Sequence, residues 1–420
     1  MQRLFGWRLY AGLLFATGCL AQAPGSPQAL TWQETQARFR ANNPTLLAGE
    51  ATINEAKAQE VTAYLRPNPD LTLGLDQITP FSGSPFRPLW QTYAYGDISY
   101  LHEREHKREL RLEDAKENTQ ITTETQNDLE RNLMFNLRDA FVRVLQAKAV
   151  VQVARDNLTY YDKEIDIAKT RYQAGDIAQV DFERIEVQRV QYLSDLQNAV
   201  VSLRTAKIDL IALLDDHTPV DQFDIVENFD FQENLKPIAD LRQVAIDQRP
   251  DLKEAVTGLE RARTDHRLTI ANGSTDPTFG MDGSHQAPPL NTYIGFSVTI
   301  PLRIFDRNQG EKVRTQLDIA RNEKLVTAAQ VAVYHDVDSA YMTVQSTLEL
   351  LKPYKQKYLQ EALDVRDKVA FSYLHGAASL LEFLDAEKAY RDTELNYLML
   401  VGAYLSAANQ VNYAVGREVM

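Results

Sequence analysis

Two very long stretches of this chain contain almost no proline. There is none between Pro88 and Pro219, and only Pro353 interrupts the sequence after Pro301. Within these stretches apolar residues recur every three or four positions, as on one face of a helix. The clearest runs are Leu129, Leu133, Leu137, Phe141 and Val144, and then Val337, Tyr341, Val344, Leu348 and Leu351. A helix over residues 104–172 would be about 100 Å long at 1.5 Å per residue. The pattern therefore predicts long paired rods, which no compact globular domain could hold.

Strand patterns are few and short. Leu71, Leu73 and Leu75 alternate with polar or small residues, and residues 294–302 alternate in the same way. Weaker candidates cover residues 93–101 and 278–283. A period of two predicts half-buried strands, and the Pro, Gly and Ser clusters between them are typical of hairpin loops. We therefore predict a mainly α chain with a small β part of four strands.

The N-terminus has the features of an export signal. Residues 1–8 carry two arginines and no acid, and residues 9–16 are an apolar run, as in a secretory signal peptide. Ala16-Thr17-Gly18-Cys19 resembles a bacterial lipobox, which predicts a signal peptide over residues 1–18 and a lipid on Cys19. Cleavage after Ala23 is the alternative. Because Cys19 is the single cysteine, a disulfide framework is excluded.

The mature chain offers only one way through a membrane. No later stretch has 18 consecutive apolar residues, so no transmembrane helix is predicted. The remaining solution is a closed β-barrel. Four strands cannot close one, because about eight strands are the lower limit. If these strands cross a membrane, several copies of the chain must share one barrel.

The net charge bears on the partners. The chain has 45 Lys and Arg against 58 Asp and Glu. An acidic protein lacks the basic footprint that phosphate binding needs, so we expect no nucleic-acid partner.

The chain also repeats itself. Tyr172 and Gly175, ahead of one helical pattern, recur 201 residues later as Tyr373 and Gly376. Further upstream, Asn43-Pro44 has a counterpart in Arg249-Pro250. Self-similarity on this scale indicates a duplication. We predict a first repeat over residues 30–215, an equatorial region over 216–248 and a second repeat over 249–416.

The ordered motifs resemble those of the TolC-type outer-membrane factors, also called outer membrane efflux proteins. The similarity covers roughly residues 30–416 and is closest to the branch that serves heavy-metal (cobalt–zinc–cadmium type) pumps. The matching motifs are Asn43-Pro44, Arg66-Pro67-Asn68-Pro69-Asp70-Leu71, Arg171-Tyr172 with Gly175 and Asp181, Arg249-Pro250-Asp251-Leu252, Phe305-Asp306-Arg307-Asn308-Gln309-Gly310, and Tyr373 with Gly376, Glu382 and Asp385.

This resemblance implies a homotrimer in the outer membrane of a Gram-negative-type bacterium. Three copies would share a 12-stranded β-barrel in the lipid, and the helices would form an α-barrel across the periplasm. The two glycine turns would be the tips that dock a periplasmic adaptor, with Arg171, Tyr172, Gly175, Tyr373 and Gly376 as docking residues. A proton-driven inner-membrane pump would supply the energy, so the chain would be a passive duct with no enzymatic activity and no cofactor.

The resemblance also implies an acidic gate near the tips. Glu382 and Asp385 are three residues apart and share one face of a helix, and Asp181 is the counterpart in the first half. In a trimer each acid becomes a ring of three carboxylates, which would repel itself and attract cations. The alternative interpretation is an ordinary solvated helix face.

Two departures from the family pattern stand out. Pro353 lies inside a predicted long helix, where it should remove a hydrogen bond and kink the rod. The second turn has Ser372 before its tyrosine, so any bond that Arg171 makes at the first turn cannot be repeated there.

Three other functions fit part of the sequence. A type I protein secretion duct would have the same fold, and a periplasmic coiled-coil scaffold would have the rods without a channel. The third is a zinc protease, because His102-Glu103-Arg104-Glu105-His106 matches H-E-x-x-H. We disfavour His102 and His106 as metal ligands, since Lys107 and Arg108 follow directly and no third ligand lies at a suitable spacing downstream.

Overall fold

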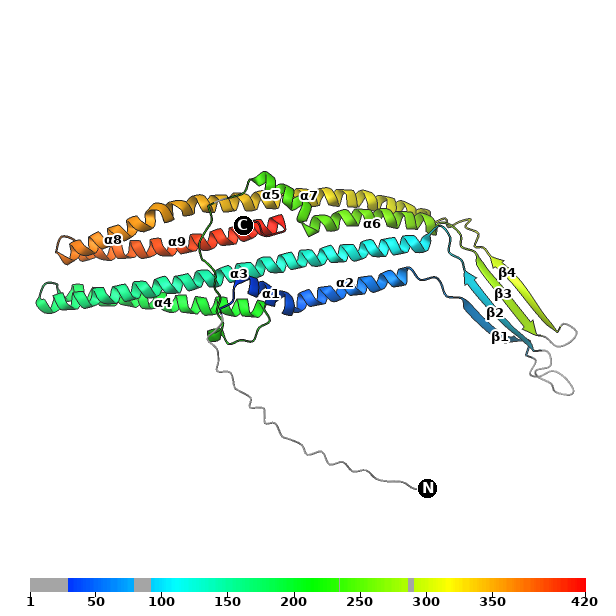
Figure 1. Cartoon of the computed structure of the whole chain (residues 1–420), viewed down its shortest axis with the longest axis horizontal. Helices are drawn as coiled ribbons and strands as arrows, with labels where there is room; N and C mark the ends of the chain where they lie inside the picture. Colours follow the sequence, from blue (N-terminus) through cyan, green and yellow to red (C-terminus); the bar gives the residue numbers. More distant parts are fainter. Residues whose placement is uncertain (1–28, 79–91, 234, 286–290) are drawn as a thin grey trace, which may run out of the picture.

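The computed structural model describes residues 29–78, 92–233, 235–285 and 291–420. Cys19 and the predicted signal peptide lie outside these residues. The molecule is elongated, with a small sheet at one end, two helical hairpin turns at the other and long rods between them (Figure 1). Within the described residues, no helix combines the length and the apolar character needed to cross a bilayer.

The order of elements is the same in the two halves. The first half contains α1 (Trp32–Asn42), α2 (Pro44–Ala63), β1 (Asp70–Asp76), β2 (Tyr93–Leu101), α3 (Lys107–Ala174) and α4 (Gln179–Leu213). A connecting segment with the short helix η1 (Val220–Gln222) follows. The second half contains α5 (Ile238–Gln248), α6 (Pro250–Asn272), β3 (Thr278–His285), β4 (Thr292–Thr299), α7 (Gln309–Pro353), the π turn η2 (Tyr354–Tyr358), α8 (Leu359–Leu374) and α9 (Leu380–Val415). The predicted rods and the four strands are thus confirmed.

Local sequence signals set where these helices begin. α1 opens on a capping box, in which Thr31 and Glu34 exchange side-chain and backbone hydrogen bonds. The Asn43 side chain accepts from the backbone N–H groups of Thr45 and Leu46 at the start of α2. Proline at the first position of α2 and of α6 fits because that N–H has no helical partner in any case.

Pro353 does not end the second rod. α7 finishes at Pro353, and η2 and α8 continue directly from it, so that the three elements form one bent rod (Figure 1). A π turn widens the helix by one residue, which makes room where proline removes a hydrogen bond and its ring crowds the preceding turn. The predicted interruption therefore takes the form of a π turn within a continuous helix.

The four strands form one antiparallel sheet with the order β1-β2-β3-β4. Its register places apolar and small residues of all four strands on one face: Leu71, Leu73, Leu75, Ala94, Gly96, Ile98, Tyr100, Phe279, Met281, Gly283, Ile294, Phe296 and Val298. Acids, hydroxyls, tyrosines and glycines share the opposite face. The apolar face is uncovered, with Phe296 83% exposed.

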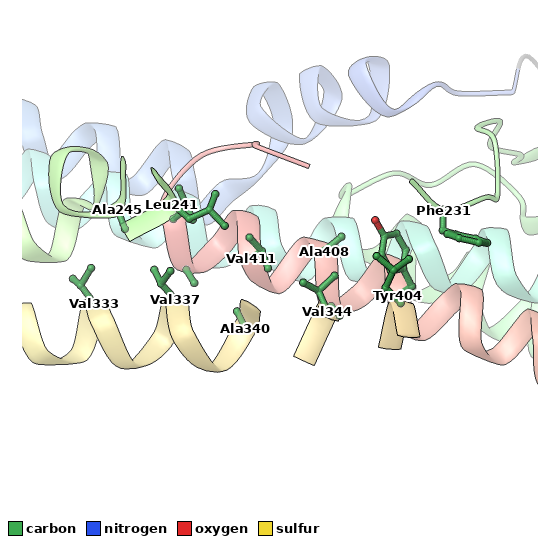
Figure 2. Packing of buried hydrophobic residues seen from close by; sticks show 14 of the residues in the cluster. Phe231, Leu241, Ala245, Val333, Val337, Ala340, Val344, Tyr404, Ala408 and Val411 are labelled. Atoms are coloured by element: carbon green, nitrogen blue, oxygen red, sulfur yellow. The ribbon is translucent and has the colours of Figure 1, made fainter. Parts of the chain in front are cut away.

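The helices pack around α3, which contacts α2, α4, α6 and α9. α7 completes the second half by packing on α6 and α9. The largest apolar cluster lies between α5, α7 and α9 (Figure 2), where Val333, Val337 and Val344 of α7 meet Tyr404 and Val411 of α9. All five of these side chains are buried, so this face of α7 is a helix seam of the coiled-coil kind that the sequence period predicts.

A segment between the two halves crosses the rods near their middle (Figure 1). It pairs with the start of the described chain through a bridge between Leu30 and Ile225. Ion pairs then fix it to helices of both halves: Lys148 of α3 bonds to Asp224 at 2.7 Å, and Lys355 of η2 bonds to Asp230 at 2.8 Å. The segment therefore ties together α3 and η2.

A buried arginine, Arg249, joins the helices α6, α7 and α9. Arg249, only 3% exposed, bonds to Asp251 at the start of α6, to Asp336 of α7 at 2.8 Å and to the carbonyl of Ala414 of α9 at 3.3 Å. Burial would raise the pKa of Asp251, but the hydrogen bonds and charge of Arg249 hold that pKa below its ordinary value. Arg131 is a second cation near Asp251, at 3.8 Å, but Arg249 makes the closer bonds and is the one that joins the three helices.

We predict that Arg249→Leu lowers the free energy of unfolding by about 2 kcal/mol, because it removes the charged hydrogen bonds to Asp251 and Asp336 and leaves the carbonyl of Ala414 without this donor. A carboxyl with a lowered pKa stabilises the fold above its unfolded value of about 3.9, and this contribution is lost as the pH falls. The deficit of the variant should therefore be largest at neutral pH and shrink on acidification. Denaturant unfolding followed by the helical signal measures both effects.

The matched control is Arg242→Leu, which breaks an ion pair with Asp338 that is about 40% exposed on both sides. Water replaces that pair, so little change is expected. Equal losses in the two variants would contradict the structural role given to Arg249.

Candidate functional site

The two helical turns at the end opposite the sheet are built alike. At the first, the N–H of Gly175 donates to Tyr172 and the N–H of Asp176 donates to Arg171. The second turn repeats this pair of bonds 201 residues later, with Gly376 donating to Tyr373 and Ala377 to Ser372. Both glycines have positive φ, +86° and +73°. Each turn is thus a Schellman motif, the helix ending that favours glycine.

A stacked aromatic pair supports each turn. Tyr172 stacks on Phe182 with ring centroids 5.4 Å apart, and Tyr373 stacks on Phe383 at 5.0 Å. The pairs differ in exposure, because Tyr373 is buried while Tyr172 is exposed. Burial raises the pKa of Tyr373. The first turn therefore presents its tyrosine to solvent, and the second packs its tyrosine inward.

Arg171 links the two turns. Its guanidinium donates to the carbonyl of Tyr373 at 3.3 Å and lies 5.2 Å from the centre of the Tyr373 ring. This contact joins α3 of the first hairpin to α8 of the second. The predicted docking residues Arg171 and Tyr373 are thus brought together, and they have a structural role within one chain. Ser372, which precedes the second tyrosine, offers no equivalent cation.

The predicted gate acids begin the helices that leave these turns. Glu382 forms a capping box with Ser379, whose side chain accepts from the Glu382 N–H while the Glu382 carboxylate accepts from the Ser379 N–H at 2.7 Å. The hydrogen bonds from the Ser379 backbone and hydroxyl lower the pKa of Glu382. Asp385 lies one turn further along α9, and both acids are exposed.

Asp181 stands on α4 of the other hairpin and lies 4.0 Å from Arg184. The residue that corresponds to Ser379 is Ala178, which has no side-chain cap to offer. Asp181 therefore lacks the reciprocal bond that holds Glu382. Within one chain, Glu382 and Asp385 share an exposed face, whereas Asp181 belongs to a separate helix.

A further group of residues lies near these turns, and no sequence motif marks it. Glu387 of α9 is buried beside Tyr160 and Glu164 of α3 and Arg366 of α8. The sequence does contain a signal for the burial of Glu387, because Leu380, Phe383 and Glu387 follow the helical period of a buried stripe. A glutamate at a buried position of such a stripe is unusual, because carboxylates are rarely buried without a partner.

The H-E-x-x-H segment does not form a zinc-binding helix face. His102 directly follows β2 and stacks edge-on against Phe279, while His106 has a φ of +54° and precedes α3. Glu103 forms a two-pronged ion pair with Arg111. Two histidines at this spacing bind one zinc only when a helix carries both. No group of three or more potential metal ligands occurs within the residues that the structure describes.

Comparisons with known proteins agree on one family. The model of the "Outer membrane efflux protein" family matches residues 241–417. The cobalt-zinc-cadmium resistance protein CzcC of Cupriavidus metallidurans is 26% identical over 323 residues, which are 74% of each chain. The cation efflux system protein CusC of Escherichia coli K12 is 25% identical over 305 residues, which are 68% of this chain and 65% of CusC.

Solved structures show the same fold. A crystal structure of CusC, described in connection with transmembrane channel formation, superposes with a TM-score of 0.76 at 20% identity and covers 94% of this chain and 96% of CusC. The open-state structure of the Neisseria gonorrhoeae MtrE outer membrane channel gives a TM-score of 0.74 at 15% identity, covering 92% and 89% of the two chains.

Long hairpin rods joined to a two-faced sheet are thus the architecture of outer-membrane channel proteins. The chain is similar to the outer membrane efflux proteins, as its motifs predicted, and the match to the family model lies in its second half. Both named relatives belong to metal-cation resistance or efflux systems, as their names state.

We predict that Gly175→Ala and Gly376→Ala each lower the free energy of unfolding by about 1 kcal/mol, because an L side chain is strained at positive φ. No heavy atom lies within 4 Å of a Cβ placed at either position, so steric clash adds nothing. Gly310→Ala is the control, since its site in α7 is equally open but has an ordinary φ. There we expect no loss or a small gain in denaturant unfolding. The same effect at all three positions would contradict the turn geometry as the cause.

Proposed function

We propose that the chain forms the passive outer-membrane exit duct of a tripartite efflux system. Three copies would build the duct, a periplasmic adaptor would dock at the helical tips, and a proton-driven inner-membrane pump would supply the energy. The chain itself would catalyse no reaction. The observation that carries this proposal is the two-faced sheet with unpaired edges at one end of paired hairpins.

The sheet needs further strands to be complete. Within the described residues, β1 and β4 are edge strands, each with one row of backbone groups that no other strand pairs. Unpaired backbone groups are costly in lipid, so a membrane sheet has to close on itself. Pairing β1 of one copy with β4 of the next would close a 12-stranded barrel from three chains. Its apolar face, with Leu73 and Phe296 mostly exposed, would then meet lipid.

The helical rods also carry an uncovered apolar stripe. Val180, Val187, Val201 and Ile208 of α4 lie on a seven-residue spacing that is interrupted by Ser194, and all four are more than half exposed. The opposite face of α4, with Ile185 and Tyr192, already packs within the chain. A heptad stripe is the pattern by which one helix packs on another. A neighbouring copy is the partner that would cover it in a trimeric α-barrel.

The exposed acids of α9 support a gate at the tip. Three copies would bring Glu382 and Asp385 into two stacked rings on the same helix faces. Rings of carboxylates repel each other and concentrate cations. The bond of Arg171 to the second turn would hold the hairpins of each copy together, so that docking of the adaptor could release them.

The cargo we propose is small solutes, with heavy-metal cations as the favoured class. This rests on the named relatives, which are a cobalt-zinc-cadmium resistance protein and a cation efflux protein. An acidic entrance would suit cations.

The gate is tested by single-channel conductance in planar bilayers. The double variant Glu382→Gln with Asp385→Asn removes the charges but keeps the capping box, which glutamine also forms. We expect the low, cation-selective conductance of the wild type to rise severalfold in the variant, with loss of cation selectivity. Equal conductance in the wild type and the variant would show that Glu382 and Asp385 do not form the gate. No conductance in either protein would contradict the proposal that the chain is a duct.

The trimer is tested on the α4 stripe. Val187→Lys places a charge in the proposed interface and should convert trimers to smaller species in detergent, measured by light scattering after size exclusion. Glu186→Lys makes the adjacent exposed residue basic on a different face and should leave the trimer intact. A monomeric wild type would contradict the proposal.

A further inference from the structure

Glu387 lies at the seam between the two helical hairpins. Its side chain is carried by α9 and only 4% of the residue is exposed. Within the described residues, its Oε1 atom is buried and accepts no hydrogen bond. A carboxylate in such a place is costly when charged, because burial removes its water and a free oxygen lacks a donor.

The neighbours of Glu387 come from both hairpins. Tyr160 of α3 lies near the carboxyls of both Glu387 and Glu164, and it lowers the pKa of each against the effect of burial. Arg366 of α8 stacks between the rings of Tyr160 and Tyr390, 4.3 Å from each ring centre. The cluster is therefore assembled only when the first hairpin packs against the second.

The charges in the cluster do not balance. The titratable and charged groups that face Glu387 are Tyr160, Tyr161 and Glu164 of α3, Tyr192 of α4, Arg366 and Asp367 of α8, and Tyr390 of α9 itself. Arg366 is the cation among them, and it also bonds to Asp367 at 2.7 Å. A second cation, Arg391, lies one turn further along α9 beside the Tyr192 ring and pairs with Asp195 of α4 at 3.5 Å. Burial raises the pKa of Glu387 to about 7, with Arg366 opposing and Glu164 adding to the rise. Burial likewise raises the pKa of Glu164.

We propose that Glu387 is a proton-binding latch between the two hairpins, which hold together when its carboxyl is protonated and loosen when it ionises. In the protonated form, the seam carries one fewer buried negative charge beside Glu164. In the ionised form, two neighbouring carboxylates compete for Arg366 and Tyr160. The latch is a property of one chain, because every group in it comes from the same copy.

The direction of the pH effect follows from proton linkage. In separated hairpins Glu387 would be solvated and its pKa would return to about 4.3. Between that value and about 7 the packed state binds more protons, so acidification favours packing. As the pH rises through about 7, this advantage is lost. This step rests on the proposed function: if the chain is the duct proposed above, acid conditions would favour the closed state of its helical end.

The test measures the hairpin separation directly. Spin labels attached through an unnatural ketone amino acid at Lys169 of α3 and Lys368 of α8, both exposed, report the distance without labelling Cys19. Electron–electron double resonance on the full-length mature protein would be recorded from about pH 5 to about pH 9. We expect the wild-type distances to lengthen and broaden as the pH rises through about 7. Glu387→Gln, which mimics the protonated acid, should keep the short distances throughout.

Two further variants sharpen the result. Glu164→Gln removes the neighbouring charge and should move the transition down by on the order of one pH unit. Glu361→Gln changes an exposed acid of α8 that pairs with Lys357 at 3.7 Å, and it should leave the transition where it is. Distances that do not depend on pH in the wild type, or an unchanged transition in Glu387→Gln, would overturn the latch.

Infrared titration keeps the proposal testable if a variant fails to fold. The wild type should show the carbonyl band of a buried protonated carboxylic acid, lost as the pH rises through about 7, and this band should be weaker in Glu387→Gln. Absence of the band at acid pH would contradict the proposal. Neither readout requires conduction, so a protein that conducts no ions would refute the duct and still leave the latch to be judged on its own.

Discussion

The burial of apolar side chains along α3 is the interaction on which the rest of the chain depends. Four other helices pack on this one rod, and Leu137, Phe141 and Val144 lie at its centre with no exposed surface. Most helix stability in a folded protein comes from tertiary packing, so these partners stabilise the 68-residue helix along its length. The crossing segment adds ion pairs at mid-length. The sheet and the helical turns are thus held at opposite ends of a common frame.

This frame leaves surfaces that a single chain does not cover. The apolar face of the sheet, its two open edges and the heptad stripe of α4 all end in solvent within one copy. Exposed apolar area of this extent marks contact with lipid or with protein. These surfaces lie on both the sheet and the rods. A single symmetric association of several copies could cover the α4 stripe and pair the two sheet edges, and would leave the apolar sheet face on the outside of the assembly.

Polar groups concentrate where the two hairpins meet. Arg171 reaches from one hairpin to the backbone of the other, Glu382 caps α9, and Glu387 lies buried between the rods. These residues serve the packing of one chain as well as any role in gating. A test that replaces Glu382 with alanine would therefore confuse loss of charge with loss of a helix cap. Substitutions that preserve hydrogen bonding separate the two.

Period and composition were enough to predict the rods, the four alternating strands and the duplicated turns, because helical and strand periods are properties of the chain alone. The stacking of Tyr172 on Phe182, the bond of Arg171 to the opposite hairpin and the π turn after Pro353 were not visible at that level. The order of residues along the chain was sufficient to identify the apolar faces and the two glycine turns at which the chain reverses. The burial of Glu387 and the exposure of Asp385 follow from how the helices pack, because burial depends on which helix surfaces meet, and residues far apart in the sequence supply those surfaces.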